Sequence, residues 1–290
     1  MNILSIQSHV TFGHVGNGAA VFPLQRLGFE VWPVNTVQFS NHTGYPTWRG
    51  RVFEAAHVAE LVEGLAERGV LESCDAVLSG YLGDAALGAA ILDAVARVRA
   101  ANPEALYACD PVMGDVTPGV FVRPDIPAFM SGRAVPAADL ITPNQFELEL
   151  LTGVAVQSLA DAVVGARKAL ALGPKVVLVT SLRHDGTKAG EIEMLAVTAQ
   201  AASRVATPFL DMDPAPNGAG DALAALFLAF YIKGGRSIEA VPEALGQAAA
   251  AVFAVIAETR RGGTRELQLI AAQDQLVDPN RRFTVEQVGG

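Results

Sequence analysis

Short apolar segments alternate with helical stripes along most of the chain. Continuous apolar runs predict strands buried on both faces, whereas apolar residues at helical spacing predict helices with one buried face. The predicted strands cover 2–7, 30–39, 75–80, 105–110, 139–144, 175–181, 191–198 and 202–207, the last two as a hairpin. The predicted helices cover 17–27, 54–68, 86–100, 145–151, 158–172, 221–232 and 237–257. This alternation predicts an α/β fold with right-handed βαβ crossovers and a central, mostly parallel sheet.

Polar and glycine residues recur directly after the predicted strands. In open parallel sheets, ligands bind beyond the carboxyl ends of the strands, so these residues are expected to line one cleft. They are Ser8 to Asn17, Ser40 to Tyr45, Gly80 with Tyr81, Asp110 to Asp115, Thr142 to Glu147, and Thr180 with Ser181.

Each of these features also has a purely structural interpretation. Asp110 precedes a proline, which by itself favours the end of a strand. The segment 142–147 could be only a helix start, with Thr142 as the cap, Pro143 in the first turn and Glu147 complementing the helix dipole. Tyrosines such as Tyr45 and Tyr81 more often pack at a partly exposed surface than contact a ligand. Both interpretations stay open at this point.

The stretch PNGAGDALAALFLAFYIKGG places Gly218, Gly220 and Asp221 before an apolar helix without a charge from 222 to 232. Asp221 could simply favour the helix start, with both glycines supplying positive φ. Alternatively, the glycines let backbone N–H groups converge on an anion while the carboxylate takes a proton from a hydroxyl. The sequence contains no GxxxxGK[ST] loop, so GAGD is its best candidate for holding a phosphate.

Composition narrows the function classes. The 290 residues are 51% hydrophobic and 18% charged, with a net charge of −9 and no basic cluster, which argues against nucleic acid or an anionic membrane as partner. The run 222–232 is too short to span a bilayer, and the first ten residues predict a strand rather than a signal peptide. Cys74 and Cys109 match neither a disulfide framework nor a metal site and fit a reducing cytoplasm. The five histidines lack zinc-site spacing, and Gly13, Gly16 and Gly18 do not form GxGxxG.

Six motifs in order resemble one family. They are SIQSHVTFGHVGN (5–17), VQFSNHTGY (37–45), LSGYLG (78–83), CDPVMGD (109–115), ITPNQFELELL (141–151) and GAGD (218–221). The last resembles the G-x-G-D motif of the ribokinase superfamily, and together they closely resemble the pyridoxal kinases, in the bacterial pyridoxamine/pyridoxal kinase branch. The resemblance extends over nearly all of the chain and implies a single ribokinase-like domain over 1–290.

The resemblance also implies a reaction: transfer of the ATP γ-phosphoryl group to the 5′-hydroxymethyl group of pyridoxal, pyridoxine or pyridoxamine in vitamin B6 salvage. Asp221 would be the general base, with the N–H groups of Ala219 and Gly220 beside Gly218 as the anion hole. Ser8 would bind the pyridine ring, Thr43 and Gly44 would bound its pocket, and Tyr81 would lie near it.

The remaining implied roles concern ATP, Mg²⁺ and assembly. Asp110 and Glu147 would organise Mg²⁺ and the phosphates, partly through water. Thr142 and Thr180 would touch the phosphates, and Thr207, Pro208, Phe209 and Leu210 would flank the adenine. The resemblance further implies a cytoplasmic homodimer.

The sequence departs from the family pattern at two positions. Ala219 stands where a larger residue is common, and Thr180 where related bacterial enzymes carry lysine; Arg183 and Lys188 are candidate substitutes. The alternatives are a hydroxymethylpyrimidine kinase, which shares the phosphate device, and a vitamin B6 binding protein without catalysis.

Overall fold

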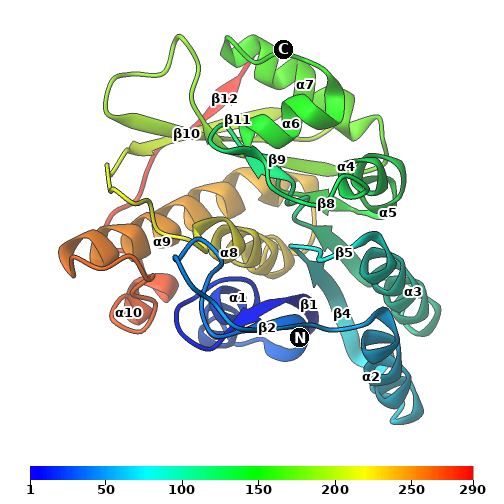
Figure 1. The fold of residues 1–290 in the computed structure, drawn as a ribbon. Coiled ribbons are helices and arrows are strands. Elements are labelled where there is room, and N and C mark those ends of the chain that lie inside the picture. Colours follow the sequence, from blue (N-terminus) through cyan, green and yellow to red (C-terminus); the bar gives the residue numbers. More distant parts are fainter. Residues whose placement is uncertain (290) are drawn as a thin grey trace.

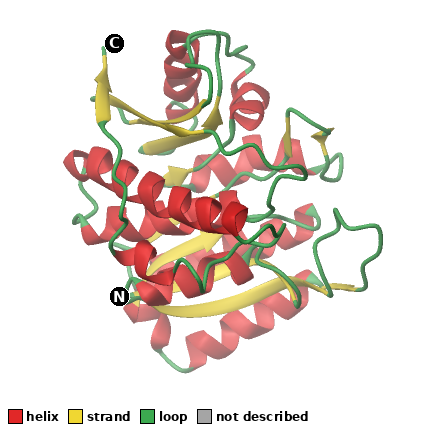
Figure 2. Ribbon diagram, turned by 90° about the vertical axis from the view of Figure 1, so that its left-hand side faces the viewer, coloured by secondary structure: helices red, strands yellow, loops and turns green. Residues whose placement is uncertain are grey.

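A ten-stranded sheet runs through the molecule in the computed structural model, which describes residues 1–289 (Figures 1 and 2). The strand order is β12-β11-β10-β9-β8-β5-β4-β1-β2-β3. Six neighbouring strands are parallel: β9 (Val176–Leu182), β8 (Leu140–Ile141), β5 (Leu106–Cys109), β4 (Cys74–Ser79), β1 (Asn2–Val10) and β2 (Glu30–Phe39). The other four strands of this sheet pair antiparallel. They are β3 (Gly50–Val52) on one edge, and β10 (Glu191–Val197), β11 (Ala202–Pro208) and β12 (Val285–Val288) on the other.

Helices cover both faces of this sheet, so each face has its own core (Figure 1). The first core contains residues of α8 (Ala219–Lys233), α9 (Val241–Arg261), α1 (Asn17–Arg26) and α10 (Gln273–Val277). The second core contains α2 (Ala55–Glu67), α3 (Ala85–Ala101), α4 (Ile126–Phe129), α5 (Val135–Ala137), α6 (Gln145–Thr152) and α7 (Leu159–Leu170). The predicted α/β architecture with a mostly parallel, doubly covered sheet is confirmed.

Most predicted elements are present, with shifted ends. The hairpin is confirmed, since β10 and β11 pair antiparallel from Glu191 opposite Pro208 to Val197 opposite Ala202. The strand predicted at 139–144 is wrong in length, because only two residues pair in β8 before the chain turns into α6. The interrupted helices over 126–137 and the strand β12 were not predicted. Pro127, Gly132 and Pro136 break the helical periodicity there, and β12 is a short, partly exposed edge strand.

Helix α8 is buried along its whole length from Ala222 to Ile232, which explains its uncharged sequence. It packs between α1 and α9. By length and composition, the segment Ile238–Arg261 could cross a membrane, but 56% of its apolar part is buried against other elements of the fold.

Candidate active site

The turn before α8 brings Asp221 to the carboxyl end of the parallel strands. Gly218 caps the helix in a left-handed conformation, with φ of 87°. A Cβ at this position would lie 1.9 Å from the carbonyl oxygen of His14, so only glycine fits. The expectation of positive φ is confirmed at Gly218 and wrong at Gly220, which already belongs to the helix and is exposed.

The carboxyl group of Asp221 is largely surrounded by protein but stays partly accessible to solvent. Burial raises the pKa of its carboxyl group from the ordinary 3.8 to about 6, although a hydrogen bond with the Gly16 backbone opposes the rise. Its side chain nevertheless stays partly accessible. A carboxylate with this pKa is ionised at neutral pH and basic enough to accept a proton from a bound substrate.

The first turn of α8 offers donors for an anion. Ala222 is the first residue of the helix whose N–H has an intrahelical partner, the carbonyl oxygen of Gly218. Over residues 1–289, no acceptor is found for the N–H groups of Ala219, Gly220 and Asp221, and no side chain caps the helix. Because unpaired N–H groups at a helix start attract anions, this turn can receive a phosphate.

Asp110 lies directly after β5 and is 7% exposed. Burial, together with the charges of Glu147 and Asp221, holds the pKa of Asp110 well above its ordinary value, against a hydrogen bond from Thr142. That bond joins Thr142 Oγ1 to Asp110 Oδ1 at 2.9 Å. Thr142 was expected as a helix cap if the segment were only structural; this is wrong, because α6 begins three residues later and Asn144 caps it.

Glu147 closes a capping box at the start of α6. Its N–H donates to Asn144 Oδ1 at 2.8 Å, while its Oε2 accepts from the N–H of Asn144 at 2.9 Å. Its Oε1 accepts from the N–H groups of Met113 and Gly114 at 2.8 and 3.4 Å. Burial nonetheless raises the pKa of Glu147 to about 7. Both oxygens already accept protein hydrogen bonds, so Glu147 is better placed to bind a cation through water than directly.

Thr180 lies beside this cluster, because Asn144 and Thr180 form an isolated parallel bridge. The N–H of Thr180 donates to the carbonyl oxygen of Pro143 at 2.9 Å, and the residue is 7% exposed. Ser181, the next residue, has φ of 52°, which is strained for a residue with a side chain. Such strain often occurs at ligand sites, where the backbone must present a particular residue.

Two of the residues expected to bind the vitamin, Ser8 and Tyr81, lie next to glycines that surround Asp221. A Cβ on Gly16, which bonds Asp221, would lie 2.5 Å from Ser8 Oγ, so Ser8 packs directly against this loop. A Cβ on Gly80 would lie 3.7 Å from Asp221 Oδ1. Tyr81 follows Gly80 and is partly exposed, and burial raises the pKa of its hydroxyl.

Thr43 and Gly44 lie in the exposed loop after β2. Arg265 holds this loop: its Nη1 donates to the carbonyl oxygen of Gly44 at 3.3 Å, and its guanidinium lies 4.7 Å from the centre of the Tyr45 ring. Burial and the nearby Arg265 charge lower the pKa of His42.

The segment expected to flank adenine lies two strands beyond Thr180. Thr207 and Pro208 end β11 and line a cavity of about 310 Å³, to which Lys188 also contributes. The guanidinium of Arg183 lies 4.5 Å from the centre of the Phe209 ring, and Leu210 is partly exposed. In the described part of the chain, no hydrogen bond or ion pair joins Arg183 or Lys188 to Thr180.

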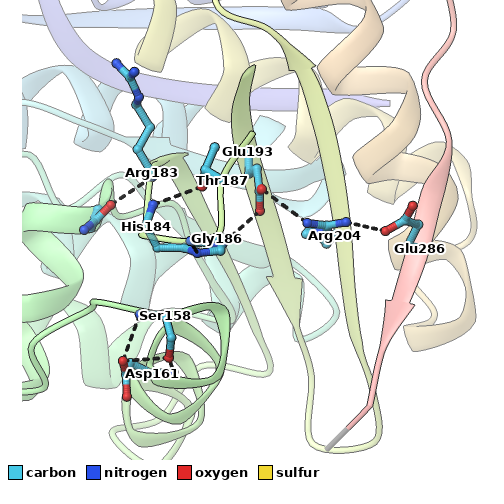
Figure 3. A network of polar contacts seen from close by, with 10 residues as sticks. Ser158, Asp161, Arg183, His184, Gly186, Thr187, Glu193, Arg204 and Glu286 are labelled. Carbon is cyan, nitrogen blue, oxygen red and sulfur yellow. Dashed lines mark hydrogen bonds and ion pairs between the residues drawn. The ribbon is translucent and has the colours of Figure 1, made fainter. Parts of the chain in front are cut away.

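A polar network fixes the loop between β9 and β10 (Figure 3). His184 Nε2 lies 3.3 Å from Glu193 Oε2, and Arg204 Nη1 lies 3.2 Å from Glu193 Oε1. Arg204 also forms an ion pair with Glu286, and this pair links β11 to β12. Arg183 points away from this network, as Figure 3 shows, and its guanidinium lies over the Phe209 ring instead.

The sequence also carried a signal that the motif search missed. Ser5 and Gln7 are polar residues two apart in the otherwise buried β1, and a pair of this kind indicates a polar network in the core. Gln7 Nε2 donates to Ser5 Oγ at 3.0 Å, and Ser5 Oγ donates to Asn17 Oδ1 at 2.8 Å. A Cβ on Gly80 would lie 2.6 Å from Gln7 Oε1, so this network packs against the backbone of Gly80, next to Asp221.

The donor set of the site suits magnesium better than zinc. Among residues 1–289, no group of three His, Cys, Asp or Glu side chains could hold a metal ion. Mg²⁺, however, keeps several waters and needs only one or two carboxylates together with substrate phosphates. Asp110 meets that requirement, because it is buried and, within residues 1–289, forms an ion pair with no Lys or Arg.

Comparison with known proteins agrees with this geometry. The sequence model of the phosphomethylpyrimidine kinase family matches residues 56–263. "Pyridoxal kinase PdxY" of Rubrobacter xylanophilus is 61% identical over 289 residues, covering 99% of this chain and 98% of its own. "Pyridoxal kinase PdxY" of Deinococcus radiodurans is 55% identical, with coverages of 99% and 96%. The Leishmania donovani pyridoxal kinase, solved with ADP and pyridoxamine, superposes with a TM-score of 0.89 at 31% identity, covering 99% of each chain. The chain therefore belongs to the pyridoxal kinases, within the wider phosphomethylpyrimidine kinase family and with their ribokinase-like fold.

Proposed function

We propose that this protein phosphorylates the 5′-hydroxymethyl group of pyridoxal, and of pyridoxamine and pyridoxine, with ATP. One observation carries the proposal: a partly accessible carboxylate with a pKa of about 6, Asp221, lies in the same helical turn as three unpaired N–H groups. The relatives called pyridoxal kinase, and the Leishmania structure with ADP and pyridoxamine, support the same reaction.

In the proposed mechanism, the oxygen of the 5′-hydroxyl group attacks the γ-phosphorus while Asp221 takes its proton. The bond between the γ-phosphorus and the bridging oxygen breaks, and ADP leaves with that oxygen. The N–H groups of Ala219 and Gly220 stabilise the negative charge on the transferring phosphoryl group. Ser8, Thr43, Gly44 and Tyr81 would orient the vitamin, since positioning supplies much of the rate in phosphoryl transfer.

We further propose that Asp110 holds Mg²⁺ and that Glu147 supports it through water. The metal would neutralise charge on the β- and γ-phosphates. Thr142 and Thr180 would contact the phosphates, and Thr207 to Leu210 would flank adenine. Thr142 also lowers the pKa of Asp110 by its hydrogen bond, which favours the ionised, metal-binding form.

Assembly and location follow by resemblance. We propose one domain over 1–290 that forms a homodimer in the cytoplasm. The single ten-stranded sheet supports the first point. The two buried free thiols, Cys74 and Cys109, suit a reducing compartment.

A panel of substrates with Mg-ATP tests the function. ADP formation is measured with pyridoxal, pyridoxamine, pyridoxine and hydroxymethylpyrimidine at equal concentrations. We expect the B6 vitamers to be phosphorylated with the higher kcat/KM. A clear preference for hydroxymethylpyrimidine would assign the chain to that activity, and pyridoxal binding without ADP formation would indicate a binding protein.

A further inference from the structure

Two loops that follow the neighbouring strands β1 and β2 converge on one acid. These are the glycine loop, residues 11–16 after β1, and the pocket loop, residues 40–48 after β2. Tyr45 Oη in the pocket loop donates to Glu266 Oε1 at 2.6 Å, and the N–H of His14 in the glycine loop donates to Glu266 Oε2 at 3.3 Å. Glu266 follows α9, far along the chain, and is only 8% exposed. A carboxylate suits this position because its two oxygens can accept from both donors.

Gly13 and Arg265, on either side of Glu266, allow both loops to lie close to its carboxylate. A Cβ on Gly13, which has φ of 97°, would lie 1.9 Å from Glu266 Oε2, so only glycine lets the loop approach so closely. On the other side, Arg265 covers the Tyr45 ring and donates to the carbonyl oxygen of Gly44. The hydrogen bond to Glu266 is the main cause that raises the pKa of Tyr45.

The glycine loop connects Glu266 with the base. The carbonyl oxygen of His14 fills the space where a Cβ on Gly218 would stand, and the backbone of Gly16 bonds Asp221. Asn217, directly before Gly218, forms a parallel bridge with Glu266. A shift of Glu266 would therefore move the loop that fixes the start of α8 and the carboxylate of Asp221.

From this geometry, we propose that Glu266 is a positioning residue of the kinase site, which holds the pocket loop and the base-bearing turn in a fixed relation. The inference rests on the proposed kinase function. Glu266 touches no reacting atom; it acts through Tyr45 on the vitamin pocket and through the glycine loop on Asp221.

Three variants separate the two hydrogen bonds that Glu266 accepts, one from Tyr45 in the pocket loop and one from His14 in the glycine loop. Glu266→Ala removes both, so we expect the KM for pyridoxal to rise about tenfold and kcat to fall about tenfold, with the KM for ATP within about twofold. Tyr45→Phe removes only the hydrogen bond between the pocket loop and Glu266. It should raise the KM for pyridoxal about fivefold at unchanged kcat. Glu266→Gln should stay within about threefold of wild type, because a glutamine oxygen can accept from His14 while the Tyr45 hydroxyl accepts from its amide.

Asp75→Ala is the matched control. Asp75 also ties two segments together, accepting from the N–H of Asn2 at 2.7 Å and pairing with Arg236 at 2.6 Å, but at the amino ends of β1 and β4. We expect this variant to unfold at lower temperature and to keep the wild-type kcat and both KM values. Equal kinetic effects of Glu266→Ala and Asp75→Ala would overturn the proposal, since both would then reflect lost stability.

Amide hydrogen exchange on the free protein gives a readout that does not depend on activity. Glu266→Ala should speed exchange in both residues 11–16 and 40–48, whereas Asp75→Ala should leave both loops unchanged. Unchanged exchange in either loop would overturn the coupling. Wild-type protein without activity on the vitamers would instead contradict the proposed function, and the exchange result would still decide whether Glu266 joins the two loops.

Discussion

Asp139 and Asp110 lie at opposite ends of the same pair of strands, β5 and β8, and their environments are opposite too. Asp139, before β8, accepts from the N–H of Tyr107 at 3.0 Å and pairs with Arg99 at 2.6 Å and Lys175 at 3.2 Å. Burial alone would raise the pKa of Asp139, but the Tyr107 N–H and Arg99 outweigh it and lower the pKa. In Asp110, burial and neighbouring carboxylates prevail, and its pKa is raised.

The difference separates acids whose charge is compensated within the fold from acids whose charge is not. Over residues 1–289, no Lys or Arg forms an ion pair with Asp110, Glu147 or Asp221. Leaving three buried or half-buried carboxylates without a cation costs stability at neutral pH, and proteins retain such clusters mainly at functional sites. The positive charge that is missing at this end of the sheet is what Mg²⁺ would bring.

The largest expected effect is that of Asp221→Asn. We expect turnover with pyridoxal to fall by roughly 10²–10⁴-fold, because the amide cannot take the proton, while pyridoxal binding is retained. Stability should change in the opposite direction. A folded-state pKa raised from 3.8 to about 6 means that ionised Asp221 destabilises the fold once the pH exceeds both values. The variant should therefore be more stable at pH 8 by up to ~3 kcal/mol, and by almost nothing near pH 4.

Steady-state kinetics and chemical denaturation at pH 4 and pH 8 measure both effects. Asp75→Asn, at the other end of the sheet, is the control for an Asp-to-Asn change outside the site. Near-normal turnover of Asp221→Asn would contradict its role as base. A loss of stability at pH 8 would show that the carboxylate is compensated in the folded protein, against the comparison drawn above.

Magnesium should correct the imbalance at the acidic end. The raised pKa values of Asp110, Asp221 and Glu147, the last two at about 6 and 7, predict that stability without metal falls as the pH rises through 6–7. We expect millimolar Mg²⁺ to restore ~1–3 kcal/mol at pH 8 and far less at pH 5. Thermal unfolding with Mg²⁺ or EDTA measures this. Asp110→Asn should lose the response and Asp139→Asn should keep it; an equal response in both would exclude Asp110 as the metal ligand.

The parts of this contrast that the sequence revealed are those encoded in local patterns. The β-branched run at 30–39 predicted β2 with its observed ends, and the uncharged stretch after Asp221 predicted a buried helix. Local patterns failed where two interpretations share the same residues. Gly220 was expected in a turn with positive φ but already lies in the first turn of α8. Thr142 was considered as a cap, although Asn144 offers the same chemistry closer to the helix.

Other parts depend on contacts between distant residues and had no local signal. Glu266 reaches its partners His14 and Tyr45 across more than two hundred positions, inside a segment without a motif. The pairing of Asp139 with Arg99 likewise depends on how α3 packs against the sheet, since neither residue differs in sequence from an ordinary surface charge. Whether an acid is compensated is a property of the fold, so only the structure could divide the acids into two groups.

At the compensated end, Asp139→Asn should have a moderate effect on stability alone. We expect a loss of ~1–3 kcal/mol at neutral pH, because charge-assisted bonds with Arg99 and Tyr107 become neutral ones. A depressed folded-state pKa contributes stability above the ordinary carboxyl pKa and loses it as the pH falls through the folded value. The penalty should therefore vanish in strong acid. Urea denaturation at pH 7 and pH 3 measures it, and a changed kcat in this variant would contradict a purely structural role.

The smallest expected effect is the pH dependence of the wild-type enzyme, and it distinguishes the members of the acidic group. With saturating Mg-ATP, kcat/KM for pyridoxal should fall about tenfold per pH unit below about 6, since the base must be ionised and the pKa of Asp221 is about 6. Raising the Mg²⁺ concentration should leave this acidic limb in place, because the proposed metal ligand is Asp110 and not Asp221. If the limb instead moves to lower pH as Mg²⁺ increases, the group that titrates competes with the metal. The acidic limb would then belong to Asp110 or Glu147, and the assignment of Asp221 as the titrating base would be wrong.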